Sequence, residues 1–596
     1  MSLPPPDPGH GIGWLPPDLS TALAAEAERL EFPAGARLFR EGDAADAFYV
    51  IEAGVVRIQR EHEELDTDPV LSLLEAGRTF GELGLLDDQP RAASAYADEA
   101  LRVWKFPRAA LARLERENPV IAAAFYHHLG REAARKLRAA NERRAGSAAQ
   151  PEEEDGEVDE LVAAAASAQK EIARWPEERI DILLEKVANA IAARAAELAE
   201  LTVAVTHLGN AADKTRKNEM ASLGVFRDLQ GRTGLGLLGS DAETGVAEYA
   251  APAGVVFALV PVTNPVATAI FKSLICLKSR NAVILSFHRA ARELARAVGK
   301  ILQGTLAEAG APVTLIQWVR VRNSRRKTER FFAHPGVALI LATGGRSMVQ
   351  AAYSSGKPAI GVGPGNAPVL IGSDCDLRNA AACIVESKSF DHGVICGSEN
   401  NLVVPEAVLA EFALALEATG AAVLNSKETT AFRAIFVLEE KATLRRSAVG
   451  QAAAEIAQRC GITRPFPIRL LVVPAGPLDP ADAMAREKTA PIVGLFTVPD
   501  EAAGVELCGQ LLELEGCGHT AVIHSRNEQL VEQFALRMPA SRILVGSPAS
   551  QGVVGATTGL IPSFMLGCGY PGGNSTSDNI TFTHVRHLKR LARIQP

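Results

Sequence analysis

A cysteine between small residues is the first feature of this chain that points to chemistry. The segment 387–404 reads SKSFDHGVICGSENNLVV and contains Cys396. A deprotonated cysteine is a strong nucleophile, and small neighbours with accessible backbone amides help to stabilise a thiolate. We expect a helix to begin close to Cys396. The seven other cysteines are expected to be buried apolar side chains. None of the eight forms a CxxC pair, so neither a disulfide scaffold nor a metal site is predicted.

A second polar motif reads FGELGLLDDQPRAAS and spans residues 80–94. In this motif Gly81 leaves a backbone amide accessible, Glu82 offers a carboxylate to hydroxyl groups, and Arg91 offers a planar fork to a phosphate. A short helix between them would direct its first amides at the same anion. Taken alone, such a motif favours a loop that carries one surface arginine.

The elements that position these residues belong to a large, mildly acidic chain. The 596 residues include 62 Lys and Arg against 70 Asp and Glu, which gives a net charge of −8, and 47% of them are apolar. This length predicts several domains. The charge argues against nucleic acid and membrane surfaces as partners. The chain contains neither a run of about 18 apolar residues nor the basic and apolar regions of a secretory signal. A cytoplasmic, multidomain protein is therefore expected.

The composition changes near residue 150, where we expect a domain boundary. Residues 1–18 are Pro-rich and predict a flexible N-terminus. Residues 19–145 start with short apolar runs separated by Gly and Asp, which predict antiparallel strands of a sandwich or barrel, and end in a helix over 117–145. The segment 146–157, GSAAQPEEEDGE, predicts an acidic linker.

Residues 158–596 have the pattern of a large α/β protein. Helical stretches over 161–173 and 178–200 precede apolar strands that alternate with further helices. The clearest strands read GVVFALVPV, NAVILSF, VALILATGG, PVLIGS and HTAVIHS. This alternation predicts parallel sheets covered by helices.

The motif at 80–94 resembles the cyclic-nucleotide-binding domain of cAMP-dependent kinase regulatory subunits and catabolite-activator-type regulators. The upstream run LFREGDAADAFYVIEAGVVRI fits the jelly-roll β-barrel of that family. The resemblance implies that Glu82 binds the ribose 2′-hydroxyl and that Arg91, with the Ala92 amide, binds the cyclic phosphate. Ala92 stands where cGMP-selective members carry threonine, which favours cAMP. The nucleotide-binding residues implied in this way are Gly81, Glu82, Leu83, Arg91, Ala92 and Ala93.

The segment around Cys396 resembles the active-site segment of acylating, CoA-dependent aldehyde dehydrogenases, including the aldehyde half of the bifunctional aldehyde–alcohol dehydrogenases. Further motifs of that family follow in the same order along 157–596. They include VPVTNPVATAIFKSLICLKSRNAVILSFHRAAR, LILATGGRSMVQAAYSSGKPAIGVGPGNAPVLI and LGCGYPGGNSTSDN. The resemblance implies an aldehyde dehydrogenase-like α/β fold with cofactor-binding, catalytic and oligomerisation parts.

The resemblance also implies a mechanism in which Cys396 adds to an aldehyde carbonyl. Asn264, in the TNP turn, would stabilise the oxyanion, and capping of the turn before Pro265 is the alternative role for its side chain. Hydride transfer to NAD would leave a thioester on Cys396. Hydrolytic members activate water with a glutamate, whereas this chain has Val362 at that position. Coenzyme A is therefore the expected acyl acceptor, in a reversible reaction.

Further residues match the family's cofactor contacts. The resemblance puts Ser286 and His288 near the adenosine ribose, the Thr343–Gly345 turn at the pyrophosphate, and Glu487 at the nicotinamide ribose. His519, in a GHT motif, either borders the cleft or is a core histidine. The full set of implied cofactor-binding residues is Thr263, Ser286, His288, Thr343, Gly344, Gly345 and Glu487.

The sequence therefore predicts an NAD-dependent, CoA-acylating dehydrogenase of a short aldehyde, with acetaldehyde as the default substrate and cAMP as an effector. The resemblance implies a homo-oligomer, a dimer or larger. Propionaldehyde, sulfoacetaldehyde, succinate semialdehyde and NADP remain open. An alternative from another class is a cyclic-nucleotide sensor whose dehydrogenase part is a scaffold or metabolite sensor. A third keeps the enzyme and makes the barrel an assembly module.

Overall fold

The structure is a computed structural model of the 596-residue chain. It divides into two compact units, Met1–Pro151 and Glu152–Pro596. The predicted flexible N-terminus, most of the helix expected over 117–145 and the start of the predicted linker lie outside the described residues. The structure describes residues 27–59, 70–120, 122–123, 125–126, 129–130, 151–320 and 324–594.

The first unit is built from two four-stranded sheets, with strand orders β1-β8-β3-β6 and β2-β7-β4-β5. All paired strands in them are antiparallel, which confirms the predicted antiparallel fold. Along β8 the burial alternates because successive side chains of a strand point to opposite faces. The strands are β1 (Glu28–Phe32), β2 (Arg37–Phe39), β3 (Ala47–Ala53), β4 (Val56–Gln59), β5 (Val70–Leu74), β6 (Thr79–Phe80), β7 (Ser94–Ala97) and β8 (Leu101–Pro107).

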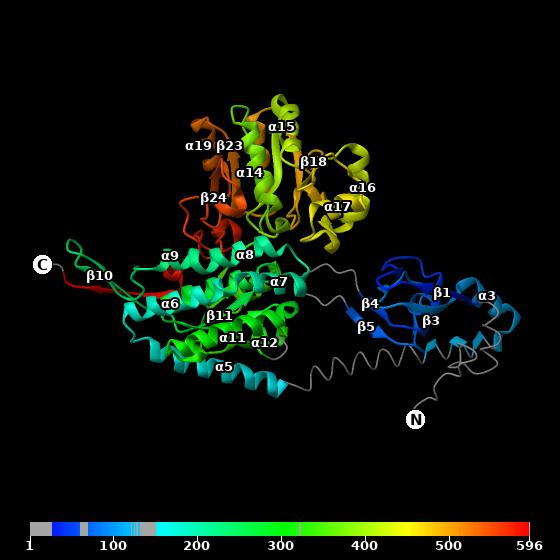
Figure 1. Cartoon of the computed structure of the whole chain (residues 1–596), viewed down its shortest axis with the longest axis horizontal. Helices are drawn as coiled ribbons and strands as arrows, with labels where there is room; N and C mark the ends of the chain where they lie inside the picture. Colours follow the sequence, from blue (N-terminus) through cyan, green and yellow to red (C-terminus); the bar gives the residue numbers. More distant parts are fainter. Residues whose placement is uncertain are drawn as a thin grey trace. The chain divides into compact units, whose positions relative to one another are not determined.

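The second unit opens with helices that cover its first sheet (Figure 1). They are α5 (Pro151–Ile172), α6 (Glu177–Ala192), α7 (Ala195–Thr206) and α8 (Ala211–Glu219). The acidic run 152–157 lies in α5, so the second half of the predicted linker is helical instead. The stretch 178–200 forms two helices rather than one.

The first α/β sheet of this unit has the strand order β13-β12-β11-β14-β15, and all its pairs are parallel. From β11 the chain moves outward to β12 and β13, then returns to the other side of β11 for β14. The carboxyl ends of β11 and β14 therefore flank a topological switch point. The elements are β11 (Val255–Val260), α10 (Pro265–Lys278), β12 (Ala282–Phe287), α11 (Arg292–Glu308), β13 (Ile316–Trp318), α12 (Arg325–Ala333), β14 (Val337–Ala342), α13 (Arg346–Ser354) and β15 (Ala359–Gly361).

The second α/β sheet has seven strands in the order β18-β21-β22-β17-β16-β23-β24, again all parallel. Its inner strands are almost continuously buried, as expected for parallel strands covered on both faces. The two sheets confirm the predicted α/β fold. The strands are β16 (Ala367–Ile371), β17 (Glu399–Pro405), β18 (Ala421–Val423), β21 (Leu470–Pro474), β22 (Ile492–Val498), β23 (Gly518–His524) and β24 (Ala540–Val545).

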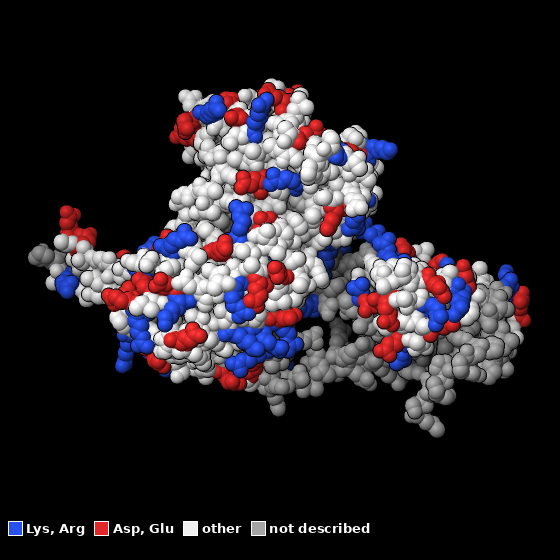
Figure 2. Space-filling view, in the orientation of Figure 1, with Lys and Arg blue, Asp and Glu red and all other residues white. Residues whose placement is uncertain are grey.

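A third, three-stranded sheet of the second unit is antiparallel, with the order β25-β10-β9. Strands β9 (Gly236–Asp241), β10 (Val246–Pro252) and β25 (Arg586–Ala592) form a slender extension of the unit (Figure 1). On the face drawn in Figure 2, acidic and basic side chains are intermingled over this unit. None of the helices in the described part of the chain combines the length and apolar character that crossing a membrane requires.

Candidate functional site

Cys396 lies in a turn that leads directly into β17. The helix expected to begin near this residue is therefore absent from this part of the described chain, and the turn is held by close backbone packing instead. A Cβ on Gly365 would lie 1.6 Å from the carbonyl oxygen of Cys396. Upstream, Asp391 and His392 have φ angles of 47° and 53°, a left-handed conformation that is costly for residues other than glycine and is often found at functional sites.

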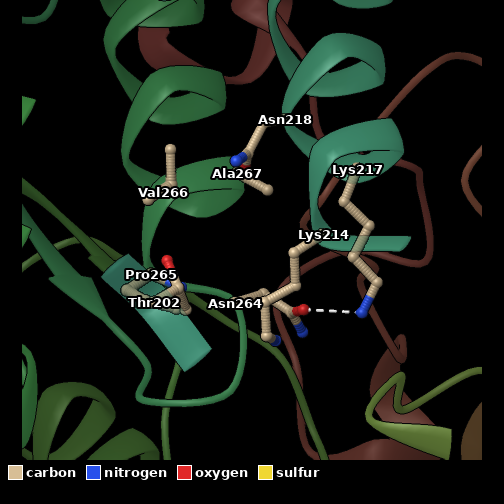
Figure 3. A pocket seen from close by; sticks show the side chains of 8 residues that line it. All are labelled: Thr202, Lys214, Lys217, Asn218, Asn264, Pro265, Val266 and Ala267. Carbon is tan, nitrogen blue, oxygen red and sulfur yellow. Dashed lines mark hydrogen bonds between the residues drawn. The ribbon is translucent and has the colours of Figure 1, made fainter. Parts of the chain in front are cut away.

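Asn264 approaches the same turn from the other sheet, at the N-cap position of α10. Asparagine at this position usually caps the helix with its side chain, but the Asn264 side chain makes no capping hydrogen bond. Its Nδ2 donates instead to the Val394 carbonyl at 3.1 Å, and its Oδ1 accepts from Lys217 at 2.7 Å (Figure 3). The side chain thus reaches the loop that carries Cys396, and turn capping is not what it does here.

Three residues of this site were missed by the sequence analysis: Lys214 and Lys217 of α8, and Asp391. Both lysine ammonium groups donate to Asp391 Oδ2, at 2.9 and 2.5 Å. Lys214 also donates to the Thr263 carbonyl at 3.0 Å. The spacing i, i+3 places the two lysines on one helix face, and this was the available signal. It was weak because residues 213–219 are all polar, so nothing in the pattern marks which side chains are buried.

The surroundings of the Cys396 thiol do not stabilise a thiolate. Burial raises the pKa of Cys396 to about 12, and the neighbouring carboxylate of Glu487 and the thiol of Cys568 raise it further, against the opposing guanidinium of Arg542. The groups around Cys396 thus favour the protonated thiol in the chain without ligands. Proton loss from this thiol requires a change in its surroundings, such as the arrival of a positively charged or hydrogen-bonding ligand.

Alkylation of Cys396 in the ligand-free protein is expected to be slow and to rise tenfold per pH unit from pH 7 to pH 10. A thiol of pKa about 12 holds roughly 10³-fold less thiolate at pH 8 than an ordinary cysteine, and only the thiolate reacts. Timed iodoacetamide labelling, followed by mass spectrometry of the Cys396 peptide, measures this rate, with glutathione in the same tube as the reference. A labelling rate that levels off between pH 7 and pH 9 would contradict it.

Glu487 lies on the other side of the same turn. Its Oε1 accepts from the backbone amide of Gly365 at 3.3 Å. Burial raises the pKa of Glu487 to about 8, and neighbouring Glu515 adds to the shift. Glu487 is therefore close to the thiol, at a position compatible with its predicted role beside the nicotinamide ribose.

His519 is fully buried on β23. Burial lowers the pKa of His519 to about 3, with Arg542 adding to the shift, so the imidazole is neutral. Its Nδ1 lies 2.9 Å from Thr520 Oγ1. Its Nε2 has no hydrogen-bond partner among the described residues. A core histidine with hydrogen bonds at both ring nitrogens is therefore not what the described residues show at this position.

Some of the predicted dinucleotide contacts lie at the topological switch point. Thr263 follows β11, and the turn Thr343–Gly345 follows β14. Ligands of parallel sheets bind in the crevice outside the carboxyl ends of such strands. Thr343 Oγ1 is buried and has no hydrogen-bond partner in the described part of the chain, which leaves it available to a ligand. Ser286 and His288 stand at the end of β12, the next strand outward, so the residues present fit an extended dinucleotide.

Position 362 follows β15, and Val362 there is buried. It offers no carboxylate that could activate water. A Cβ on Gly363 would lie 3.3 Å from Cys568 Sγ.

In the first unit, the motif at 80–94 forms a compact cradle around Arg91. The short helix α2 (Leu83–Leu86) follows Gly81 and Glu82, as predicted. Arg91 is buried; it donates to the Gly81 carbonyl at 2.7 Å and to Asp46 at 3.0 Å, and it stacks over Phe39. Its Nε has no hydrogen-bond partner among the described residues. Gly81 has a φ of 77°, in the left-handed region that favours glycine, and a Cβ there would lie 2.6 Å from the Arg91 guanidinium.

The predicted role of Arg91 at a cyclic phosphate has a direct test. If that role holds, Arg91→Ala is expected to bind cAMP roughly 10²-fold more weakly than the unchanged chain, because one or two charge-assisted hydrogen bonds to the phosphate are lost. Isothermal titration of the full chain with cAMP measures the effect. Arg29→Ala is the matched control, since Arg29 pairs with Glu52 at 2.8 Å on the surface of the same unit. If the Arg91→Ala protein and the unchanged chain bound cAMP with equal affinity, Arg91 would not be part of the binding site.

Comparisons with known proteins extend over both units. The aldehyde dehydrogenase family model matches residues 131–565, and the cyclic nucleotide-binding domain model matches residues 29–118. The sulfoacetaldehyde dehydrogenase (acylating) of Cupriavidus necator is 36% identical over 438 residues, which cover 72% of this chain and 88% of that one. The aldehyde-alcohol dehydrogenase 2 of Entamoeba histolytica is 37% identical over 448 residues, which cover 74% of this chain and 51% of that one.

Among solved structures, an acetylating aldehyde dehydrogenase from Geobacillus thermoglucosidasius is similar to this chain with a TM-score of 0.72 and 37% identity. The match covers 74% of this chain and 98% of that structure. Against the bifunctional aldehyde–alcohol dehydrogenases, the matched part spans about half of the relative's length.

Proposed function

The chain belongs to the aldehyde dehydrogenase family, and on that premise we propose that it oxidises a short-chain aldehyde to an acyl-CoA, with NAD as hydride acceptor. The observation that carries the proposal is the meeting of two side chains from different sheets. The Asn264 amide and the Cys396 turn are joined through the Val394 carbonyl, at 3.1 Å from Asn264 Nδ2.

In the proposed reaction, the Cys396 thiol gives up its proton to solvent, and its sulfur forms a bond to the aldehyde carbon. The carbonyl oxygen becomes an oxyanion, which the second N–H of the Asn264 amide and the backbone N–H of Cys396 stabilise. Such donors act strongly because they are preorganised in a site that excludes water. When bound, NAD supplies the acceptor for the aldehydic hydride. The residues that would hold it are those at the switch point, with Thr343 Oγ1 as an unpaired hydroxyl.

Loss of the hydride leaves an acyl thioester on Cys396, and we propose that the thiol of CoA takes the acyl group. Attack by water needs a general base, and Val362 stands where hydrolytic relatives carry one. Transfer to a thiol exchanges one thioester for another, regenerates the Cys396 thiol and keeps the reaction reversible. The relative from Cupriavidus necator, named as acylating, supports this choice.

A small cavity lies beside Asn264, on the side of α8. Thr202, Val266 and Ala267 contribute to its walls. The two lysines that also line it are bound by Asp391 and by backbone carbonyls. We propose a short aldehyde, acetaldehyde foremost, and the similarity to an acetylating aldehyde dehydrogenase supports this choice.

The test is NADH formation from acetaldehyde by the purified full chain, with and without CoA and with and without cAMP. Turnover that requires CoA supports the acylating reaction. Turnover without CoA would show that water reaches the thioester and would contradict the inference drawn from Val362. Sulfoacetaldehyde and succinate semialdehyde, tested in parallel, rank the substrates, and NADP in place of NAD ranks the cofactors.

We also propose that the chain acts as a homo-oligomer and that cAMP on the first unit modulates it. Strand β25 is largely exposed and, with Leu588, Leu591 and Ile594, offers apolar surface on an extended sheet. Exposed strands with apolar side chains are prone to pair with another chain. Light scattering after size-exclusion chromatography, with and without cAMP, measures the assembly. A monomer under both conditions would contradict the oligomer.

A further inference from the structure

Two buried lysines below the oxyanion site have no role in the reaction proposed so far. Lys214 and Lys217 lie one turn apart on α8, and each side chain is only 4% exposed. A buried ammonium loses its hydration and persists only where charges and hydrogen bonds compensate. Burial lowers the pKa of Lys217 to about 8, although the attraction of Asp391 opposes the shift. An arrangement this demanding calls for a structural or functional reason.

All three donors of the Lys217 ammonium are used. Its Nζ donates to Asn264 Oδ1 at 2.7 Å, to Asp391 Oδ2 at 2.5 Å and to the Val394 carbonyl at 3.1 Å. Since an ammonium has three N–H groups, this side chain is held in one place. It joins α8, the turn before α10 and the loop that leads to Cys396.

The contact with Lys217 decides which way the Asn264 amide faces. With Oδ1 on the ammonium, Nδ2 faces Val394, donates one hydrogen to its carbonyl and keeps the second for the oxyanion. In the flipped orientation, an NH₂ group would face the ammonium and Oδ1 would face a carbonyl oxygen, and both contacts are repulsive. The ammonium also polarises the amide, which strengthens its remaining N–H as a donor.

We propose that Lys217 is a positioning residue for the oxyanion site. It orients and polarises the Asn264 amide, and Asp391 holds its ammonium group in place. The proposal rests on the function proposed above, because it assigns Lys217 to the same reaction.

Asp391 is suited to hold the Lys217 ammonium in place because its hydrogen bonds join three segments of the chain. Its Oδ2 accepts from both lysines, and its Oδ1 accepts from the backbone amide of Asn210, which caps α8, at 2.9 Å. Its own backbone amide donates to Asp213 at 2.8 Å. Burial by itself would raise the pKa of Asp391, but the two ammonium groups outweigh it and keep the carboxylate ionised. The left-handed backbone at Asp391 is sustained by these bonds.

The experiment compares two reactions of the Cys396 thiol in the full chain without cofactors. Acylation by 4-nitrophenyl acetate passes through a tetrahedral oxyanion, whereas alkylation by iodoacetamide does not. We expect Lys217→Met to slow acylation about 10- to 100-fold, part of the effect of losing an oxyanion donor outright. Alkylation should change less than twofold, because the charged groups acting most strongly on the thiol are Glu487 and Arg542. Equal slowing of both reactions would overturn the proposal.

Lys278→Met is the matched control. Lys278 is also fully buried and pairs with two carboxylates, Glu177 at 2.7 Å and Asp181 at 2.6 Å, but it lies at the far end of α10. Its loss should lower the unfolding temperature and leave the ratio of acylation to alkylation unchanged. A second control adds Lys217→Met to Asn264→Ala. The double variant is expected to acylate no more slowly than Asn264→Ala alone. If instead the slowing by the two substitutions multiplied, Lys217 would not act through Asn264.

Asp391→Asn keeps the test decisive if Lys217→Met does not fold, as circular dichroism would show. This variant preserves the shape of the side chain and removes the charge that holds the ammonium, so it should lower the same ratio. An unchanged ratio in a folded Asp391→Asn protein would contradict the role of Asp391. The same experiments separate this inference from the proposed function. If the proposed function is wrong, the unchanged chain lacks CoA-dependent turnover. If only this inference is wrong, that turnover is present and Lys217→Met does not change it.

Discussion

Replacing Cys396 by serine is expected to reduce CoA-dependent NADH formation by about 10⁴-fold or more, by analogy with the loss of other catalytic nucleophiles. The reason is chemical: a serine hydroxyl is a far weaker nucleophile than a thiol unless a base activates it. Position 362 supplies no such base, since Val362 is an apolar, buried residue. The measurement is steady-state turnover with acetaldehyde, NAD and CoA.

Cys383→Ser is the control for this substitution. Cys383 lies on α14 (Leu377–Ser389), and its thiol is 3.9 Å from the Gly546 carbonyl, so its replacement should leave kcat unchanged. Cyclic-nucleotide binding by Cys396→Ser should also stay unchanged. Residual turnover within tenfold of the unchanged chain would point to another nucleophile, with Cys568 the first candidate because it acts on the Cys396 thiol. If the Cys396→Ser protein retained its cellular role, the scaffold or sensor alternative would be favoured.

Replacing Asn264 by alanine is expected to lower kcat by roughly 10²- to 10³-fold with a small change in KM, the effect seen when one oxyanion donor is removed. Because the Asn264 side chain makes no capping bond, its loss should have little effect on the stability of α10. Asn264→Asp should be worse still. It places a negative charge at the oxyanion and turns a carboxylate oxygen toward the Val394 carbonyl. Steady-state kinetics and thermal unfolding of the same preparations separate the two effects.

Asn425 provides the matched control, because it also stands at a helix N-cap. It precedes α16 (Ser426–Phe436), and its side chain accepts from the Glu428 amide at 3.0 Å in a complete capping box. Asn425→Ala should therefore destabilise the chain by about 1 kcal/mol and leave kcat unchanged. The two variants are expected to give opposite results in the two assays. A large loss of stability with normal kcat in Asn264→Ala would restore the capping interpretation of this residue.

Much of the fold could be predicted from local patterns. Apolar runs such as NAVILSF are almost fully buried strands because a parallel strand is covered on both faces. The acidic run 152–157 predicts a linker, and the boundary between the two units falls within 146–157, but this run forms the start of α5. The break between α6 and α7 was missed because alanine-rich sequence continues through it, and an αα turn needs no strong breaker.

The candidate site was only half predictable. The motifs around Cys396 and Asn264 indicated both residues, and the run from Gly81 to Arg91 indicated the nucleotide cradle. The motif did not reveal the protonation state of the thiol, because a pKa depends on what surrounds the sulfur in space. The segment GVGPGN and Glu487 lie far from Cys396 in sequence, yet they enclose its turn.

By itself, the sequence determined the division into an antiparallel first unit and an α/β second unit, together with the residue types available for chemistry. These properties follow from periodicity and composition, which act over neighbouring residues. Only the tertiary structure decided that Lys217 and Asp391, 174 positions apart, would hold the Asn264 amide against the Cys396 loop. A buried ammonium is stable only where distant groups converge on it, so no local pattern along α8 could distinguish Lys217 from a solvated lysine.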